Sequence, residues 1–538
     1  MHRNQSVNVH QFAMIPKSDI PRSKFDCQST HKTTFDAGYL VPVYVDEMLP
    51  GDTFNLNMTA FARLATPLYP IMDNMILDSF FFFVPNRLIW SHWQQFMGQQ
   101  ANPADSISYT VPQQVSPAGG YTIGSLQDYM GLPTVGQVAG SNTVSHCAFW
   151  TRGYNLIWNE WFRDENLQNS VVVDTGDGPD TVSNYTLLRR GKRKDYFTSA
   201  LPWTQKGSPV TLPLGTSAPV KGEFIVSSNQ NPSTVGFLNA YTGGSSVPVY
   251  ASSVSGSFST GDQLTSIQSG VHGLYADLSS ATAATINQIR QSFQIQKLLE
   301  RDARGGTRYT EIVRSHFGVA SPDSRLQRPE YIGGGSTPVN INPIAQTSAT
   351  GVSGGSTPMG TLAAMGTVLA HKHGFTYSAV EHGIIIGLVS IRADLTYQQG
   401  MHKMWSRSTR YDFYFPVFSH LGEQAILNKE IYVDGSSNDN NVFGYQERWA
   451  EYRYNPSRIS SLFRSTASGT LDAWHLAQKF TTLPSLAATF IQDTPPVSRV
   501  VAVGASANGQ QFIFDSFFDV KKARPMPMYS VPGLVDHF

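Results

Sequence analysis

Four consecutive phenylalanines, Phe80–Phe83, stand near the end of the apolar run 75–84. Successive side chains of a β-strand point to opposite faces, so a strand made of this run is apolar on both faces. Such a strand has to be covered on both sides. The run therefore predicts a buried strand and a fold that places apolar layers above and below it.

The residues after this strand predict an amphipathic helix. Pro85 suits the first turn of a helix, and Gly98 suits its end. Between them, apolar side chains recur at helical spacing: Leu88, Ile89, Trp93 and Met97. Apolar stripes also predict helices over 150–162 and from 285 to just before Gly305.

Most other patterned segments indicate strands. Segment 53–64 alternates apolar and polar residues, which predicts a strand with one buried face. Segment 38–45 contains Pro42, which favours an edge strand. Runs of β-branched and aromatic residues predict further strands within 374–397, 410–418 and 511–520. The 45 glycines and 31 prolines favour many short strands joined by turns, so a mainly β chain is expected.

Two neutral stretches interrupt this pattern. Residues 225–275 contain one charged residue, Asp262, and 23 of the 51 are Ser, Gly or Thr. They belong to an expected large insertion at 205–282. An ordered, projecting β-like loop is favoured because the stretch also holds many apolar residues, but a disordered linker stays open. A second expected insertion is a Gly/Ser/Thr-rich loop at 333–368.

The composition excludes several classes of protein. Lys+Arg and Asp+Glu both number 39, so no global charge draws the chain to nucleic acid or to an anionic membrane. Charged residues make up 14%, below the usual figure of about 25%, so much of the surface must be neutral or covered by partners. The only cysteines, Cys27 and Cys147, favour a reducing compartment. No apolar run approaches the roughly 18 residues of a membrane helix, so no membrane insertion is expected.

No catalytic or metal-binding pattern stands out. A G-x-S-x-G match around Ser353 lacks the strand and helix that a nucleophile elbow needs. His371 and His373 lack a third local ligand, so packed or solvated histidines are favoured over a metal site. We expect no enzyme, metal or cofactor.

Basic clusters are more informative. One candidate DNA-binding group combines cations with a ring that can stack on bases: Arg189, Arg190, Lys192, Arg193, Lys194 and Tyr196. A basic surface turn around Gly191 is the alternative. A weaker group lies near the C-terminus: Lys521, Lys522 and Arg524. The mixed charges of 300–314 favour ion pairs within or between subunits over nucleic acid.

Long segments then show a resemblance. Residues 20–90, "RGKRKDYFTSALPW" at 190–203, residues 284–334 and "ARPMPMYSVPGLVDHF" at 523–538 closely resemble the major capsid protein of gokushovirus-type Microviridae, small bacteriophages with circular single-stranded DNA. The resemblance runs from about residue 12 to the C-terminus. It leaves unmatched the neutral stretch around 205–280 and parts of 333–361 and 435–442.

The resemblance implies a fold and an assembly. It implies one jelly-roll domain over 1–538, with eight antiparallel strands in two sheets and long insertions that contain several helices. It also implies self-assembly into a T=1 icosahedral shell around the genome, without catalysis. The insertion at 205–282 would then form a protrusion near the threefold axis and serve in host attachment.

The same resemblance implies partners and a location. The partners would be other copies of the chain, the single-stranded DNA genome, a small basic DNA-binding protein, an internal scaffolding protein, a pilot-type minor protein and a bacterial surface receptor. The chain would be assembled in the host cytoplasm and end in the virion capsid. Subunit-interface candidates are Phe80, Phe81, Trp90, Trp93, Arg304 and Arg308. A sugar-binding or glycan-active jelly-roll protein is the alternative, because lectins use the same architecture.

Overall fold

The computed structural model describes most of the chain: residues 21–210, 220–221, 224–228, 231–235, 263–266, 275–276, 286–320, 322–323, 326–347, 350–352, 355–357, 360–502 and 510–529. The chain divides into two compact units. The first unit joins 1–204 to 305–538, and the second comprises 205–304. The candidate site lies entirely in the first unit.

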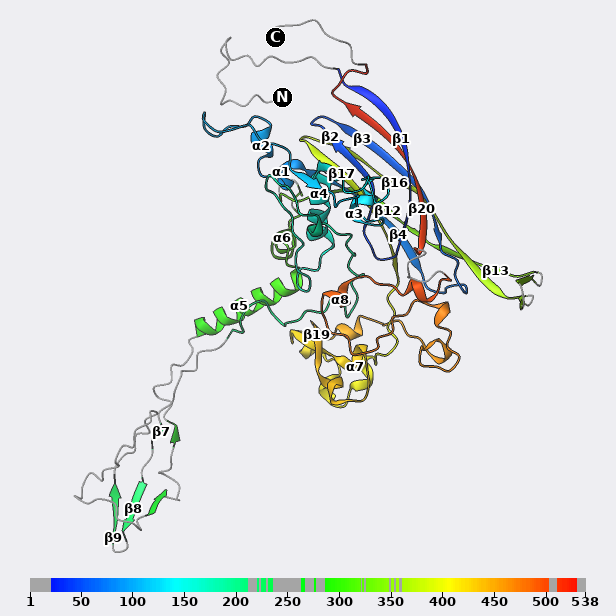
Figure 1. Cartoon of the computed structure of the whole chain (residues 1–538). Helices are drawn as coiled ribbons and strands as arrows, with labels where there is room; N and C mark the ends of the chain where they lie inside the picture. Colours follow the sequence, from blue (N-terminus) through cyan, green and yellow to red (C-terminus); the bar gives the residue numbers. More distant parts are fainter. Residues whose placement is uncertain are drawn as a thin grey trace. The chain divides into compact units, whose positions relative to one another are not determined.

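A large antiparallel sheet forms the centre of the first unit. Eight strands follow one another in this order: β1 (Ser23–Phe35), β20 (Phe512–Arg524), β3 (Thr53–Leu64), β16 (Leu362–Ser378), β12 (Glu330–Pro338), β4 (Met75–Pro85), β17 (Gly383–Ala393) and β2 (Val41–Met48). A ninth strand, β13 (Asn340–Ala345), pairs with β16. Figure 1 shows the strands curving together, and β1 and β2, at the two ends of the order, also lie near each other. The mainly β, jelly-roll fold is confirmed.

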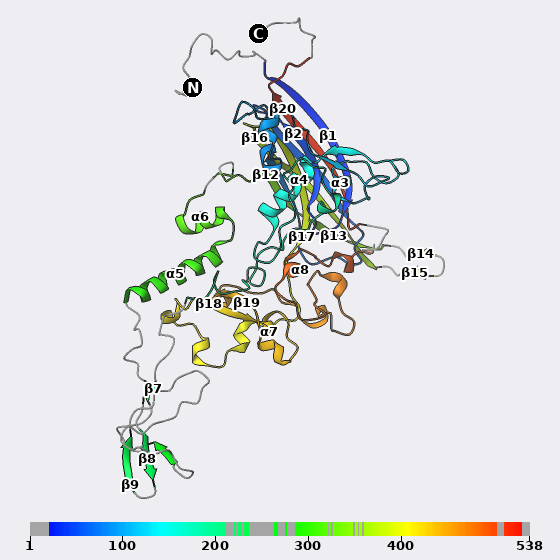
Figure 2. The ribbon, with the colours of Figure 1, turned by 60° about the vertical axis from the view of Figure 1, so that its left-hand side comes forward.

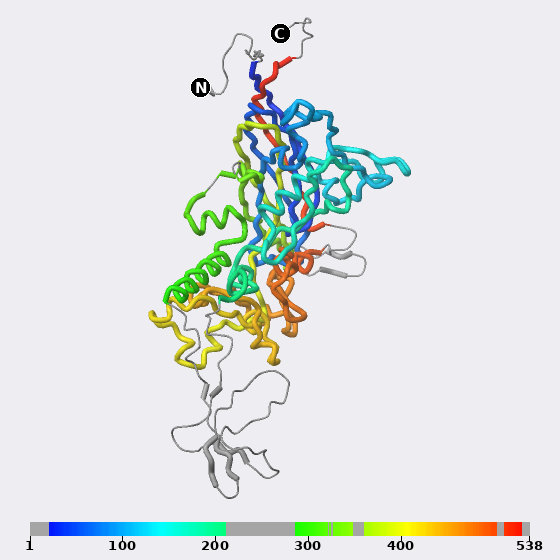
Figure 3. Tube along the Cα trace, turned by 90° about the vertical axis from the view of Figure 1, so that its left-hand side faces the viewer, coloured from blue at the N-terminus to red at the C-terminus, as the bar shows by residue number. Residues whose placement is uncertain are grey.

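Strands from the two ends of the chain lie side by side in this sheet. β1 pairs with β20 over its whole length, from Ser23 opposite Arg524 to Phe35 opposite Phe512. Figure 3 shows these blue and red segments running together. β2 is at an edge, with Pro42 beside an irregularity in its pairing with β17. The expectation of an edge strand at Pro42 is therefore confirmed, because an edge or a bulge tolerates a residue that cannot donate.

β4 belongs to two hydrophobic cores at once. Phe81 and Phe83 lie in the core inside the curved sheet. Phe82 and Val84 lie in a second core, on the other face of the strand. The predicted strand with two buried faces is confirmed. Phe81 is one of the expected subunit-interface residues. It is fully buried within a single chain, so its side chain is not available to a neighbouring subunit.

Helices cover the second core. They are α1 (Asn86–Ile89), α2 (Trp93–Phe96), α3 (Leu126–Tyr129) and α4 (Phe149–Ile157), which continues as a π-helical turn, η2 (Trp158–Phe162). Figures 1 and 2 both place α4 against the sheet, in agreement with its contacts to β17. Gly153 permits this approach, because a Cβ there would lie 2.8 Å from Cδ1 of Ile384.

The helix predicted after Pro85 is in fact two short helices. The backbone of Trp90 is extended, which ends α1. Its side chain is fully buried, and its Nε1 donates a hydrogen bond to Asp177 at 2.8 Å. Trp90 is also one of the expected subunit-interface residues, but its side chain belongs to the core and is not available to a neighbouring subunit. The predicted helix at 150–162 is confirmed by α4 and η2, and the helix from 285 by α5 (Ile286–Gly305).

A third core lies between segment 196–200 and segments that follow β17. It includes Tyr196, Phe197, Ile431 and Phe490.

The other described helices and strands of the first unit are β5 (Gln113–Val115), β6 (Ser145–Cys147), α6 (Tyr309–Phe317), β14 (Thr350–Val352), β15 (Gly355–Thr357), β18 (Glu423–Leu427), α7 (Asn428–Ile431), β19 (Val442–Glu447) and α8 (Ala488–Ile491). Its short 3-10 turns are η3 (Val182–Asn184), η5 (Lys403–Ser406), η6 (Arg410–Asp412), η7 (Pro416–Phe418), η8 (Ser437–Asn440), η9 (Ala450–Tyr452), η10 (Ser461–Phe463), η11 (Asp472–Trp474) and η12 (Val497–Arg499).

The expected loop at 333–368 contains long strands instead. β12 and β13 include 333–338 and 340–345, and β16 begins at Leu362. The glycines are there because the strands approach closely: a Cβ on Gly334 would lie 2.1 Å from the carbonyl oxygen of Ser79. Residues 348–349, 353–354 and 358–359 of this stretch lie outside the described residues. Composition alone does not separate such a glycine-rich strand from a loop.

The strand predicted at 410–418 is also wrong. Two 3-10 turns, η6 and η7, occupy it. Tyr411 and Phe413 are exposed, so their side chains do not alternate between core and solvent as in a sheet. An aromatic run that is not buried loses the packing that favours a strand.

The second unit begins at Gln205, where the large insertion was expected, and extends to Arg304. Its described elements are β7 (Val220–Lys221), β8 (Phe224–Ser228), β9 (Asn231–Val235), β10 (Gln263–Ser266), β11 (Tyr275–Ala276) and most of α5. β8 pairs with β9 and β10, and β7 pairs with β11. Most of 225–275 lies outside the described residues, so the choice between an ordered loop and a linker stays a prediction.

Burial of Phe81 gives the first testable prediction. Phe81→Ala should lower the free energy of unfolding of the unassembled chain by about 3 to 5 kcal/mol, because it leaves a cavity in the core. Phe61→Ala is the control, since Phe61 is 48% exposed on the same sheet, and should change it by less than about 1 kcal/mol. Urea unfolding measures both. Equal effects of the two changes would contradict the assignment of Phe81 to the core.

Candidate functional site: an aromatic pocket lined by basic residues

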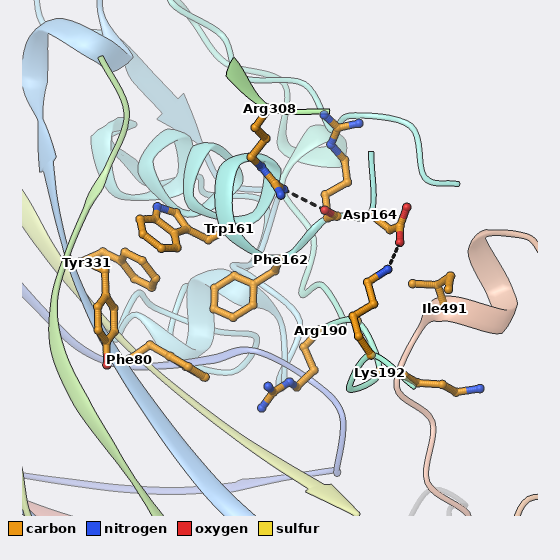
Figure 4. A pocket seen from close by; sticks show the side chains of 13 residues that line it. Phe80, Trp161, Phe162, Asp164, Arg190, Lys192, Arg308, Tyr331 and Ile491 are labelled. Carbon is orange, nitrogen blue, oxygen red and sulfur yellow. Dashed lines mark hydrogen bonds and ion pairs between the residues drawn. The ribbon is translucent and has the colours of Figure 1, made fainter. Parts of the chain in front are cut away.

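A pocket of about 420 Å³ opens on the second core of the first unit. It brings together residues from segments far apart in the sequence: Phe80, Phe82, Trp161, Phe162, Arg163, Asp164, Arg190, Gly191, Lys192, Lys194, Arg308, Tyr331 and Ile491. Figure 4 shows Phe80, Trp161 and Tyr331 on one side, with Arg190, Lys192 and Arg308 spread around the rest. The volume falls within the roughly 300 to 1,000 Å³ of small-molecule sites.

The aromatic side depends on β4 and η2. The π-helical turn η2 presents Trp161 and Phe162 towards the outer face of β4. The ring of Phe162 lies edge-on to that of Phe80, with centroids 5.2 Å apart. Phe82 contacts Trp161 at 5.5 Å and Tyr331 at 5.6 Å. Tyr331, on β12, remains 44% exposed, so part of this aromatic surface faces the open pocket.

Arg190 is held by a buried carboxylate. Its Nη1 lies 2.7 Å from Oδ2 of Asp78, which also accepts from Nε of Arg392 at 2.8 Å. Burial raises the pKa of Asp78, but hydrogen bonds from Ser336, Arg190 and Arg392 outweigh it, so the pKa is lowered overall. Asp78 is therefore ionised and fixes Arg190 at the edge of the pocket.

Lys192 is a buried cation with two carboxylates nearby, Asp493 and Asp195. Its Nζ donates to Oε1 of Gln478 at 2.9 Å and lies 4.4 Å from the ring centroid of Phe490. Burial lowers the pKa of Lys192 to about 8. Burial likewise raises the pKa of Asp493 to about 6, against the opposing effect of Arg190, Lys192 and Arg189. The positive charge of Lys192 is therefore offset by carboxylates inside the protein.

Three further cations pair with three carboxylates on the other side of the pocket, since Arg308 also lies 3.4 Å from Glu311. Nε of Arg308 lies 3.1 Å from Glu165, and Nη2 of Arg163 lies 3.5 Å from it. Burial raises the pKa of Glu165, although both arginines oppose the shift. Lys194 pairs with Asp164 and also donates to the carbonyl oxygen of Thr198 at 3.1 Å. Five cations and one carboxylate line the pocket, and Lys194, whose side chain is 57% exposed, is the most accessible of the five to an anion.

Comparisons with known proteins agree with this fold. The chain matches the family model described as "Capsid protein (F protein)" over residues 13–534. It is 47% identical to "Capsid protein VP1" of Bdellovibrio phage phiMH2K, over 99% of both chains. It is 44% identical to "Capsid protein VP1" of Chlamydia phage 1 and 35% identical to that of Spiroplasma virus 4, over 98% of each pair of chains.

The chain belongs to the F-protein capsid family. This confirms the resemblance to gokushovirus-type Microviridae, and it assigns the chain to a phage capsid with a homo-oligomeric shell. The family is one of structural proteins and is not known for enzymes, as expected. The relatives therefore favour a shell protein over the glycan-binding alternative.

The capsid chain uses most of the predicted DNA-binding residues internally. Arg189 stacks on Tyr39 at 3.9 Å and donates to the carbonyl oxygens of Ala37 and Asp493. The buried Tyr196 donates to Glu430 at 3.0 Å. The side chain of Arg193 is exposed and has no hydrogen-bond or ion-pair partner among the described residues, although its carbonyl oxygen accepts from Thr198. Arg193 and Lys194 are therefore the residues of this run that solvent reaches most freely.

The C-terminal cluster divides in the same way. Lys522 pairs with Asp46, and Nε of Arg524 lies 3.3 Å from the buried Asp52. Nζ of Lys522 lies 5.0 Å from the ring centroid of Phe54, and Cζ of Arg524 lies 5.1 Å from it. Lys521 is exposed on β20. Contact with DNA stays a prediction for this cluster, with Lys521 as its accessible member.

The remaining interface candidates lie in three different surroundings. Phe80 lines the pocket, and Trp93 packs, half-buried, against the second core. Arg308 also lines the pocket and donates to the carbonyl oxygens of Asn159 and Arg163. Arg304 is an exposed residue of the second unit. Their roles at a subunit interface stay predictions.

The two histidines at 371 and 373 lie in different surroundings. A bulge with Lys372 at φ 59° separates the exposed His371 from the buried His373. His373 hydrogen-bonds with the hydroxyl groups of Ser79 and Thr337, each at 2.8 Å. Within the described ranges, no group of three His, Cys, Asp or Glu side chains could hold a metal ion. Ser353 of the G-x-S-x-G match lies outside these ranges.

Two other sequence predictions concern cysteines and membranes. Cys27 and Cys147 are both free thiols in the capsid chain. Burial raises the pKa of the Cys147 thiol, which keeps it protonated. Among the described residues, no helix has the length and apolarity to cross a membrane.

An exposed surface that sequence reasoning missed lies on the turns after β17. We call it the aromatic face, and it consists of Trp405, Tyr411, Phe413, Tyr414, Val417 and Tyr452. Trp405 and Tyr411 are each 69% exposed. Arg407 lies over the ring of Tyr452 at 4.3 Å and pairs with the buried Glu451 at 3.5 Å. The interleaving of rings and arginines at 405–415 was the available signal, but the run was interpreted as a strand.

The two neighbouring arginines of the basic run allow a matched test. Arg190→Gln should lower the free energy of unfolding by about 2 to 3 kcal/mol, because it removes one partner of the buried Asp78. Arg193→Gln should stay within about 0.5 kcal/mol of the unmodified chain, because Arg193 is exposed. Urea unfolding of the unassembled chain measures both. Indistinguishable values would contradict a structural role for Arg190.

Proposed function

We propose that this capsid protein assembles into a T=1 icosahedral shell that encloses a circular single-stranded DNA genome. The observation that carries the proposal is the family match over residues 13–534, which spans both units of the chain. Assembly would take place in the host bacterial cytoplasm. A small basic DNA-binding protein, a scaffolding protein and a pilot-type minor protein would take part in it.

The exposed apolar surfaces support a shell subunit. Large exposed apolar patches on a soluble chain mark interaction sites, and Trp, Tyr and Arg dominate the energetics of protein interfaces. The aromatic face has this composition. A closed shell needs contacts around different symmetry axes, so each subunit needs more than one such surface.

A second surface of this kind lies on the outside of the large sheet. We call it the outer-sheet patch, and it consists of Phe61, Leu369, Ile513 and Phe517. Phe61 of β3 is directly opposite Leu369 of β16, and Ile513 of β20 is opposite Arg63, two residues along. Leu369 and Ile513 are more than half exposed. We assign both surfaces to contacts with neighbouring copies of the chain.

Assembly of an aromatic-face variant tests this function. Trp405→Ala should leave the free energy of unfolding unchanged, because the side chain is exposed. It should raise the protein concentration needed for particle formation at least about tenfold, since losing an interface tryptophan costs about 2 kcal/mol or more. Light scattering and electron microscopy of the chain with its phage partners give the threshold and the symmetry.

Val380→Ala is the control for this experiment. Val380 is 85% exposed and belongs to neither surface, so its variant should assemble like the unmodified protein. Unmodified chains that form no T=1 particles with these partners would overturn the proposed function. Normal assembly of the Trp405 variant would remove the aromatic face from the interface.

The neutral insertion at 205–282 is proposed as the host-attachment element and as the protrusion near the threefold axis. Its supporting feature is composition: Ser, Gly and Thr with apolar residues and almost no charge, at 225–275. Replacing 225–275 by a short Gly/Ser linker should leave particles intact and reduce adsorption to host cells at least about tenfold. Particle counts and adsorption assays measure the two effects, and loss of assembly would indicate an architectural role instead.

A further inference from the structure

We propose that the aromatic pocket lined by basic residues binds one unpaired nucleotide of a single-stranded DNA. The base would lie against the aromatic side, and the phosphates would meet the cations. This inference rests on the proposed enclosure of single-stranded DNA and names a site for it within the subunit. The DNA would then bind in a defined pocket and not along a general basic surface.

The aromatic side offers Tyr331 as an exposed stacking surface, while Arg190 lies over the ring of Phe80 and Arg328 over that of Trp161. Phe80, Phe82, Trp161 and Phe162 hold one another in place by ring contacts of 5.2 to 6.0 Å. The ring of Tyr331 contacts Phe82 and Trp161 yet stays 44% exposed. Base stacking on such rings is favourable for every base, because each base has a flat π-face.

The cations that line the pocket have carboxylate partners, most of which do not line it. Arg163, Arg190, Lys192, Lys194 and Arg308 line it together with Asp164 alone. The side chain of Lys194 is 57% exposed and can leave Asp164 for a phosphate.

The pocket does not suit a peptide that adds a strand to the sheet, because such a peptide pairs with a free strand edge. β4 is paired on both sides, with β12 and β17, so it has no free edge at the pocket. The lining has no Asn, Gln, Ser or Thr, so it lacks the amide groups that pair with adenine, and stacking on Tyr331 does not depend on the base. We therefore expect binding that requires an unpaired base and tolerates any sequence.

Photo-crosslinking in intact particles tests the location. DNA-filled particles are irradiated with ultraviolet light, digested and analysed by mass spectrometry for peptides that carry a nucleotide. We expect adducts on Tyr331, Trp161 or Phe162. Particles that form and contain DNA, but whose adducts all fall elsewhere, would overturn this inference and leave the proposed function standing. Failure to form DNA-filled particles would instead contradict the proposed function.

Titrations of the unassembled full chain with fluorescein-labelled oligothymidylate and oligodeoxyadenylate test the chemistry. Tyr331→Ala should weaken binding of both about tenfold, and Tyr331→Phe by less than about threefold, because a phenyl ring still stacks. Lys194→Gln should lower the slope of log affinity against log salt by about 0.7, whereas Lys32→Gln should not. Lys32 is the matched control because it is also exposed and paired with one carboxylate, Asp515.

Two competitors distinguish a DNA strand from a free nucleotide or a peptide as the ligand of the pocket. Free thymidine monophosphate should compete only at concentrations at least about a hundredfold above that of the oligonucleotide, because it lacks the neighbouring phosphates. Equal competition would overturn the assignment to a DNA strand and indicate a free-nucleotide site. Displacement by an acidic, Phe-containing peptide, with no effect of Tyr331→Ala on the oligonucleotide, would overturn it in favour of a protein partner.

Discussion

The burial of β4 on both faces is the constraint on which the rest of the first unit depends. Phe81 and Phe83 need the curved sheet as their cover, and Phe82 and Val84 need a second layer outside it. That second layer is built by α1, α3, α4 and η2, which arrive from segments 86–162. Covering a strand on both sides therefore explains why long excursions leave a sheet that could otherwise be a plain barrel.

The same requirement creates the pocket. Phe80 and Phe82 lie on the outer face of β4, and η2 supplies two further rings that meet them. The basic run at 189–194 then passes along the edge of this aromatic cluster. Its inner members are neutralised by Asp78 and Asp493, because a buried cation needs a partner. Its outer members, Arg193 and Lys194, keep their charge available to solvent.

Low charge and exposed rings have a common explanation in a shell. Surface that becomes buried between copies of the chain is better made of neutral and aromatic side chains than of ions, whose desolvation is costly. The aromatic face and the outer-sheet patch, which we propose as contacts between copies, have this composition. Equal numbers of acidic and basic residues also avoid repulsion between the many copies of a closed assembly.

The sequence by itself determined the strands and helices whose pattern is periodic and whose burial is local. The alternation at 53–64, the run at 75–84 and the stripe at 150–162 all match the structure, because spacing alone decides which face is apolar. The extended resemblance also sufficed for the family. The predictions were wrong for the glycine-rich segment 333–338, which is part of a strand, and for the aromatic segment 410–418, which contains 3-10 turns. A close approach of two strands or an exposed aromatic surface leaves no periodic pattern in the sequence.

Only the tertiary structure decided which charged and aromatic residues are available for function. Arg190 and Arg193 are near neighbours in one basic run, yet one is tied to Asp78, 112 positions away, and the other is exposed. Likewise, Phe81 and Phe80 lie on opposite faces of one strand, and only the latter reaches the pocket. Ion pairing and burial depend on residues brought together by folding over long sequence distances, so composition and spacing could not separate these side chains.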